Sequence, residues 1–435
     1  MTEFTHVDCF AGPGGICTGL HAAGFKTLVA IEFIESCCET YKKNHPDVHV
    51  IHKDICDVSA EEILPYIPKK GVDLVTSGMP CETFSTAGNT SRSFYDERQF
   101  LYRQGIRIAE ICNAKFLLFE NVPGITSKRV ARNSKRLIID QIESELDDHG
   151  FINHKRFILS AAEFGVPQNR KRFFILATKD PRIELIAPVP NPNGRKVTVK
   201  EAFAGLPDVV PNSNCEGTIY TDDSSDYAKL MKNDVFWKRA DLHSSRLTYH
   251  MPMKHRSYTL ERFKLLNPGE SLKNLFDRFT GKERERLQAM RILPKKIFIK
   301  RNYRLILDEP SPTVTSHCLD EFVHPTANRA LTVRECARLQ SFPDSYDFAG
   351  GPYITPHLHN NIQDKYEQIG DAVPPLLAFA WGKTIHKLLR KKAIKKIIIK
   401  RRVLSHESGR RFRIKKGLVR KSSSSNRNLN QRRYF

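Results

Sequence analysis

Apolar runs of strand length alternate with stretches of helical periodicity over the first 180 residues of this chain. The runs predict five strands, at 6–10, 27–31, 48–51, 72–75 and 116–119. The periodic stretches predict helices at 16–23, 34–44 and 99–112. Two later apolar runs, 152–159 and 172–177, are expected to form a closing antiparallel pair. This alternation is typical of an α/β fold with a mainly parallel sheet and helices on both faces.

The pattern breaks near residue 180. From 181 to 310 the chain is polar and rich in Pro, Asn and Ser, and it includes the linker-like stretch 188–194. Regular spacing returns with a predicted helix at 331–339, which Thr332 introduces. We therefore expect four parts: the first portion of a large domain in 1–180, a smaller irregular domain in 181–310, a return to the large domain in 311–386, and a tail in 387–435.

Positive charge is concentrated in that tail. Residues 387–435 hold 19 Lys and Arg but one acid, Glu407, and so carry +18 of the net charge of +22. The tail is interpreted either as a polyanion-binding arm or as a solvated segment that aids solubility. The chain has no apolar run of membrane length, and its first residues do not resemble a signal peptide. Its ten cysteines include no C-x-x-C pair, so reduced thiols and no structural zinc are expected.

A nucleoside pocket is predicted at the ends of the first three strands. Gly12 and Gly14 follow the first strand, where a missing Cβ lets the backbone approach a ligand closely. The dinucleotide pattern G-x-G-x-x-G fails because Cys17 occupies the third glycine position. Glu32 ends the second strand, where a carboxylate can bind ribose hydroxyls, and Asp54 follows the third, within reach of an adenine amino group. Either acid alone would more often be a solvated loop residue; their shared placement indicates a pocket.

Cys81 is the candidate nucleophile. It follows Pro80 just beyond the predicted strand 72–75, and proline restricts the direction from which the thiol can approach a target. A single cysteine is more often a small buried apolar residue. The motifs around it change that interpretation.

Six motifs follow one another in the order that is usual in DNA (cytosine-5)-methyltransferases, and the chain resembles that family over residues 4 to about 180 and about 311 to 382. Three lie in the first part: D-x-F-x-G-x-G-G at 8–15, G-x-P-C-x-x-F-S at 78–85, and E-N-V at 120–122. The others are Q-x-R-x-R at 168–172, R-x-L-T-V-R-E at 329–335, and Q-x-G-N-A-V-P at 368–374.

The resemblance implies a Rossmann-like S-adenosylmethionine-dependent methyltransferase domain, with a smaller, irregular target-recognition domain in 181–310. It implies that Cys81 is the catalytic nucleophile, that Glu120 donates a proton to the base, and that Arg172 and Arg170 bind the O2 edge of the base. The residues expected to bind the cofactor S-adenosylmethionine are Phe10, Gly12, Gly14, Gly15, Glu32, Asp54, Ile55, Pro80, Asp371 and Val373. No metal site is expected.

Two residues depart from the family's pattern. Glu82 follows the cysteine where Gln is usual, and its charge should raise the pKa of the thiol. Asp371 replaces the usual Asn, which keeps the size and an acceptor but removes the amide donor.

The implied function is sequence-specific methylation of cytosine C5 in double-stranded DNA, through a covalent bond between Cys81 and C6. A cytosine inside a duplex must be flipped out for this reaction, and the small, polar segment 85–99 suits a mobile loop that closes over it. By analogy we expect a monomeric bacterial enzyme of a restriction–modification system, cytoplasmic, nucleoid-associated and without membrane contact. A cognate restriction endonuclease would act on the same site without touching it.

Two alternatives remain open. One is a tRNA cytosine-5 methyltransferase, although such relatives carry a C-F-T signature that this sequence lacks. The other is an inactive homologue that only binds DNA, and the presence of both Cys81 and Glu120 argues against it.

Overall fold

The computed structural model of the protein describes residues 3–80, 97–131, 133–213, 216–221, 225–239, 247–354 and 362–391. The chain divides into two units, 1–384 and 385–435. The elements discussed below belong to the first unit, apart from the last residues of the helix at 375–391. The predicted nucleophile Cys81, its neighbour Glu82, most of the predicted loop 85–99 and most of the basic tail lie outside the described residues.

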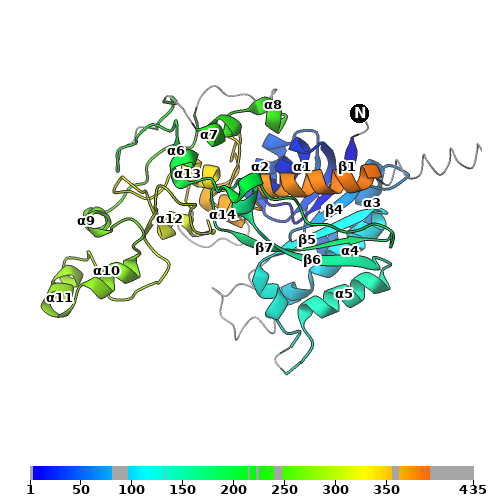
Figure 1. Cartoon of the computed structure of the whole chain (residues 1–435), viewed down its shortest axis with the longest axis horizontal. Helices are drawn as coiled ribbons and strands as arrows, with labels where there is room; N and C mark the ends of the chain where they lie inside the picture. Colours follow the sequence, from blue (N-terminus) through cyan, green and yellow to red (C-terminus); the bar gives the residue numbers. More distant parts are fainter. Residues whose placement is uncertain are drawn as a thin grey trace, which may run out of the picture. The chain divides into compact units, whose positions relative to one another are not determined.

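A seven-stranded sheet forms the centre of the first unit (Figure 1). Its strands are β1 (Phe4–Cys9), β2 (Phe25–Glu32), β3 (His49–His52), β4 (Leu74–Ser77), β5 (Phe116–Asn121), β6 (Asn153–Ser160) and β7 (Lys171–Thr178). They lie in the order β3-β2-β1-β4-β5-β7-β6. β1 to β5 are parallel, and β7 pairs antiparallel with both β5 and β6. The predicted parallel sheet and the antiparallel closing pair are therefore confirmed.

The strand order reverses between β1 and β4. The chain runs outward from β1 through β2 to β3, then returns to β4 on the other side of β1. β2 thus lies on one side of β1 and β4 on the other, and at such a switch point open α/β sheets bind ligands in a crevice at the carboxyl ends of the strands. A bond between the Gly78 amide and the Cys9 carbonyl, 3.2 Å long, joins the two strand ends.

Helices cover both faces of the sheet (Figure 1). α1 and α2 contribute Cys17 and Tyr41 to the apolar layer on one face, whereas α4 and α5 contribute residues such as Ile106 and Ile142 to the larger core on the other. These helices and the short α3 span α1 (Gly15–Ala22), α2 (Glu35–Asn44), α3 (Ala60–Ile63), α4 (Tyr102–Ile111) and α5 (Ile138–Asp148). β4 and β5 are buried at every residue, as expected for central strands covered on both sides.

Short helices, rather than βα units, make up the described parts of 181–310. They are α6 (Val199–Phe203), α7 (Asp226–Met231), α8 (Asp234–Trp237), α9 (Ser257–Leu265), α10 (Leu272–Arg278) and α11 (Gly281–Ala289). α9, α10 and α11 share an apolar cluster of their own, which includes Phe263, Leu275 and Leu287. α6 packs instead against a later helix, α13. The recognition-domain boundaries of 181–310 remain a prediction.

The last part of the first unit holds β8 (Tyr303–Arg304), α12 (Cys318–Glu321), β9 (Phe322–Val323), α13 (Val333–Leu339) and α14 (Lys365–Asp371), followed by the helix at 375–391. α13 is buried along its whole length. The predicted cap is confirmed: the Thr332 side chain accepts from the Glu335 amide, and the Glu335 carboxylate accepts from the Thr332 amide.

No helix in the described ranges is long and apolar enough to cross a membrane. Within the same ranges, no three His, Cys, Asp or Glu side chains gather as a metal site. The eight cysteines placed there are free thiols, and all but Cys56 are buried.

Candidate active site

The glycine-rich turn after β1 lies at the crevice between β1 and β4. Phe10, Gly12 and Gly14 have φ angles of 57°, 54° and 98°, in the left-handed region that favours glycine. A Cβ on Gly12 would meet no described atom within 4 Å, so open space lies over the turn there. A Cβ on Gly15 would lie 2.3 Å from the Val373 carbonyl oxygen. Glycine at position 15 therefore lets the segment around Val373 pack directly on the start of α1.

The Glu32 carboxylate lies beside this turn at the end of β2. Its Oε2 accepts from the Gly12 amide at 2.7 Å, and its Oε1 accepts from the amides of Phe33 and Ile34 at 2.9 and 2.7 Å. Burial raises the pKa of Glu32, and the three backbone bonds oppose that shift. The carboxylate is held in one orientation, next to the open space over Gly12.

Asp54 and Ile55 follow β3, as predicted. The Asp54 Oδ1 accepts from the Cys56 amide at 2.9 Å, and Ile55 is buried. Phe33, which the sequence analysis did not single out, is 48% exposed directly after Glu32. In the sequence, an aromatic residue directly after the glutamate that ends the predicted strand is the signal that could have identified Phe33.

Asp371 and Val373 come from far along the chain to the same turn. Asp371 ends α14, and its Oδ2 accepts from the Gln363 side-chain Nε2 at 2.9 Å. The Gln363 Oε1 in turn accepts from the Cys37 thiol on α2 at 3.1 Å. These bonds, with the contact of Val373 on Gly15, place the last motif against the first.

Tyr346 is hydrogen-bonded to the glycine-rich turn. Its hydroxyl donates to the Pro13 carbonyl, and the ring is buried. The Arg239 guanidinium lies 5.0 Å from the centre of this ring and donates to Asn44 Oδ1 at 2.7 Å. The sequence offered no signal for this contact, because its members come from distant parts of the chain.

Asp8 lies beneath the same turn at the end of β1. Its Oδ1 accepts from the Thr76 hydroxyl at 2.7 Å, and its Oδ2 from the Tyr41 hydroxyl at 3.3 Å. Burial, which outweighs these two bonds, raises the pKa of Asp8 to about 7. The acid is thus a buried link between β1, β4 and α2 rather than a solvated charge.

Glu120, near the end of β5, reaches the segment that leads to Pro80. A Cβ on Gly78 would lie 3.7 Å from Glu120 Oε2. The Asn121 side-chain Nδ2 donates to the Met79 carbonyl at 3.2 Å. The Pro80 end of the described chain therefore lies close to the Glu120 carboxyl group.

Arg172 contacts Glu120 directly. Its Nε lies 2.9 Å from Glu120 Oε1, and both side chains are 11% exposed. The contact follows from strand pairing, because Glu120 is opposite Phe174 across the β5–β7 ladder. Burial raises the pKa of Glu120 above its ordinary value, although the charges of Arg172 and Arg170 oppose the shift.

Arg170 has different partners from Arg172. It is 1% exposed, and its terminal nitrogens donate to the carbonyls of Val314, Gly370 and Ala372 at 2.5, 2.9 and 3.2 Å. Its guanidinium thus holds the returning chain next to the glycine-rich turn, and its charge acts on Glu120 from a distance. The predicted contact of Arg170 with the O2 edge of a base stays untested.

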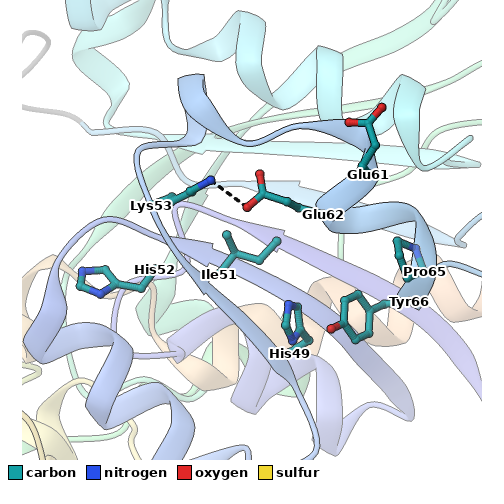
Figure 2. Close-up of a pocket in the computed structure, with 8 residues that line it drawn as sticks. All are labelled: His49, Ile51, His52, Lys53, Glu61, Glu62, Pro65 and Tyr66. Carbon is teal, nitrogen blue, oxygen red and sulfur yellow. Dashed lines mark hydrogen bonds and ion pairs between the residues drawn. The ribbon is translucent and has the colours of Figure 1, made fainter.

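A pocket of about 410 Å³ lies along the edge strand β3 (Figure 2). His49 stacks on Tyr66 with ring centres 3.8 Å apart, and Lys53 pairs with Glu62 at 2.8 Å. None of the predicted site residues lines this pocket.

The sequence matches the family described as C-5 cytosine-specific DNA methylase over residues 4–387. Among curated proteins, it is 31% identical to the Type II methyltransferase M.DdeI of Desulfomicrobium norvegicum, over 87% of this chain and 88% of the relative. It is 29% identical to the Type II methyltransferase M1.HphI of Haemophilus parahaemolyticus, over 89% of this chain and 87% of the relative.

Among solved structures, the fold is similar to a protein described as a DNA modification methyltransferase encoded within an Escherichia coli prophage. The TM-score is 0.67 at 24% identity, with 89% of this chain and 100% of the other covered. A methyltransferase of Entamoeba histolytica, EhMeth, matches with a TM-score of 0.53 at 12% identity, over 89% of this chain and 99% of the other. These likenesses confirm the predicted Rossmann-like α/β fold.

Proposed function

We propose, from the premise that this chain belongs to the C-5 cytosine-specific DNA methylase family, that it methylates one cytosine within a specific short sequence of duplex DNA. Membership makes it a DNA cytosine-5 methyltransferase that uses S-adenosylmethionine. What the proposal adds is the route of the reaction and the residues that carry it.

The observation that supports this route most directly is the placement of the Glu120 carboxyl group. It is buried and paired with Arg172, and it faces the backbone that leads through Gly78 to Pro80 and Cys81. The glycine-rich turn opens at the same sheet edge, joined to that backbone through the bond between Gly78 and Cys9. A base at this crevice would therefore meet a proton donor and a cation next to the Gly78–Pro80 backbone that precedes Cys81.

Cytosine C5 becomes nucleophilic only when the aromatic ring is interrupted. In the proposed reaction the Cys81 thiolate forms a bond to C6 while a proton passes from Glu120 to N3, which makes C5 enamine-like. C5 then takes the methyl group. Loss of the C5 proton to a base such as water expels the thiolate, and return of the N3 proton to the Glu120 carboxylate restores the neutral ring and the acid. Arg172 stabilises the developing charge at O2 and orients Glu120. The raised pKa of Glu120 suits a group that must hold a proton near neutral pH.

S-adenosylmethionine supplies the methyl group from a positively charged sulfonium. The chain's residues fit this cofactor: Gly12 borders open space, and the oriented Glu32 carboxylate is placed to accept from ribose hydroxyls. The half-exposed Phe33 and buried Ile55 offer apolar surface for the adenine ring, with Asp54 at its amino edge. Asp371, at the other end of the turn, offers a carboxylate to the α-ammonium group.

The target cytosine must leave the duplex to reach Cys81. We assign the closing loop to 85–99 and sequence recognition to 181–310, which supplies a surface separate from the catalytic strand ends. The names of the curated relatives support a place in a Type II restriction–modification system. In that setting the enzyme would act as a monomer in the bacterial cytoplasm, at the nucleoid, and share its site with an endonuclease that it does not contact.

The test is bisulfite sequencing of DNA from cells that express the chain. We expect one short sequence to be protected from conversion at a single cytosine position, and a Cys81→Ala variant expressed at the same level to protect none. Cys81→Ala should still bind DNA, because phosphate and base contacts lie elsewhere. Methylation by purified Cys81→Ala would exclude the covalent route, whereas modified tRNA with unmodified DNA would favour an RNA substrate.

A further inference from the structure

A second cleft, of about 370 Å³, lies among the short helices of the 181–310 region. It is bounded by the residues that lead into α9, by α9 itself and by the segment 294–302. Its exposed polar and aromatic lining includes Lys254, Arg256, Lys296, Phe298 and Arg301. None of these residues belongs to the catalytic or cofactor groups described above.

The lining of this cleft is strongly cationic. Five Lys or Arg residues line it, at 254, 256, 262, 296 and 301, and among its described lining residues the single acid is Asp320. Asp320 is neutralised inside the cleft, since Arg301 pairs with it at 3.0 Å. The net charge of the described lining is therefore strongly positive, in a concave surface that concentrates a positive potential.

Arginines of the cleft already bind protein groups, whereas two of its lysines form no ion pair with a described residue. Arg262 donates to the carbonyls of Ile292 and Arg291, and Arg301 is bound to Asp320. Lys254 and Lys296 are exposed, and neither forms an ion pair within the part of the chain that the structure describes. These two ammonium groups are thus available to an anion from outside.

Aromatic rings lie between the cations. The Phe298 ring is 51% exposed, with Lys296 Nζ and the Arg301 guanidinium 5.8 and 4.8 Å from its centre. Arg256 Nη1 donates to the Tyr258 hydroxyl at 3.0 Å. Exposed aromatic surface among uncompensated cations is typical of a groove that follows a nucleic-acid strand, since the cations bind phosphates and the rings contact sugars or bases.

We infer that this cleft binds the sugar–phosphate backbone of the DNA and anchors the helical region on the duplex without reading its sequence. The inference rests on the proposed function and adds a defined contact to it. Lysine ammonium groups bind phosphate as point charges, and they lack the planar fork with which arginine recognises guanine. The cleft's three described guanidinium forks, at Arg256, Arg262 and Arg301, each already have a protein partner. Its contribution should therefore be to affinity and register rather than to the choice of bases.

The experiment measures equilibrium binding of the full chain to two duplexes over a range of salt concentrations, without cofactor. One duplex carries the sequence mapped by bisulfite sequencing and the other lacks it. The test variant is Lys254→Ala/Lys296→Ala. The control is Lys264→Ala/Lys273→Ala, which removes the same charge from the same region but from lysines of α9 and α10 that are already paired with Glu261 and Asp277. Thermal unfolding of each variant checks that the fold is retained.

We expect the test variant to bind both duplexes more weakly by the same factor. The slope of log K against log salt concentration should become less steep by about 2, because each lost phosphate contact removes roughly 0.9. The control variant should keep a slope close to that of the unaltered protein. Unchanged affinity and slope in a folded test variant would overturn the inference, and so would a loss confined to the duplex with the target. An unaltered protein that bound neither duplex would instead overturn the proposed function itself.

Discussion

Two buried glutamate–arginine pairs lie in different regions of this protein and differ in how the carboxylate is compensated. Glu120 pairs with Arg172 at the candidate active site, and Glu335 pairs with Arg329 at the start of α13. Glu335 accepts from both terminal nitrogens of Arg329, at 2.8 and 2.7 Å, and from the Thr332 amide at 2.8 Å. The ion pair of Glu120 is made through one nitrogen, Arg172 Nε, at 2.9 Å.

The pKa shifts of the two acids are opposite as a result. Burial opposes ionisation at both sites. At Glu335 the charge and hydrogen bonds of Arg329 exceed the cost of burial, so the pKa lies well below its ordinary value. At Glu120 the effect of burial on the pKa is larger than the opposing effect of the Arg172 and Arg170 charges, so the pKa is raised. The comparison shows that one pairing chemistry can produce a permanent structural anion or a carboxyl group able to hold a proton, depending on the number of donors.

The largest expected effect comes from removing the proton of the active-site acid. Glu120→Gln should lower the single-turnover rate of methyl transfer by about 10²- to 10⁴-fold, the usual weight of a positioned proton donor. DNA and cofactor should still bind, and both affinities are measured alongside the rate. A near-normal rate would show that N3 is protonated by another group.

The same substitution in the other pair should act on stability instead. Glu335→Gln leaves the Arg329 charge buried without its anion and should lower the free energy of unfolding by about 3–5 kcal/mol. Urea titration measures this loss, and Glu120→Gln serves as the matched control with a smaller expected loss. Equal losses in the two variants would contradict the assignment of different roles to the two pairs.

The pH dependence of stability should separate the pairs by sign. Glu335 has a lowered pKa, so its contribution is present above the unfolded value and is lost as the pH falls through the folded one. The difference in the free energy of unfolding between the unaltered protein and Glu335→Gln should therefore become smaller as the pH falls. Glu120 has a raised pKa and penalises folding as the pH rises above the unfolded value.

The stability of the unaltered protein relative to Glu120→Gln should thus fall with rising pH, opposite in sign to the Glu335 comparison. Urea titrations from acidic pH, below the unfolded-state pKa of glutamate, up to neutral pH would measure both trends. Parallel trends in the two variants would refute the different compensation inferred for the two carboxylates.

The strands of the first 180 residues and the helices α1, α2 and α4 followed from the sequence, because apolar period and run length are local properties, whereas α3 and α5 were not predicted. The strand-end placement of Glu32 and Asp54 was also predictable, since both follow directly from strand boundaries. α4 begins at Tyr102 rather than Gln99, because a single 3₁₀ turn at Glu97–Phe100 precedes it. The helices of 181–310 were not predicted, since their short apolar stretches bury only a few residues each.

Only the tertiary structure determines that Arg170 and Arg172, which belong to the same motif at 168–172, have different partners. Arg172 lies within β7, whose pairing with β5 brings it to Glu120. Arg170 precedes that strand, and its guanidinium turns to carbonyls 144 to 202 residues away. The contact between the Tyr346 hydroxyl and the Pro13 carbonyl likewise joins residues far apart in the sequence. Sequence determines which chemical groups are available and where each strand ends, whereas burial and the count of donors, which set the charge of each group, exist only after the chain has folded.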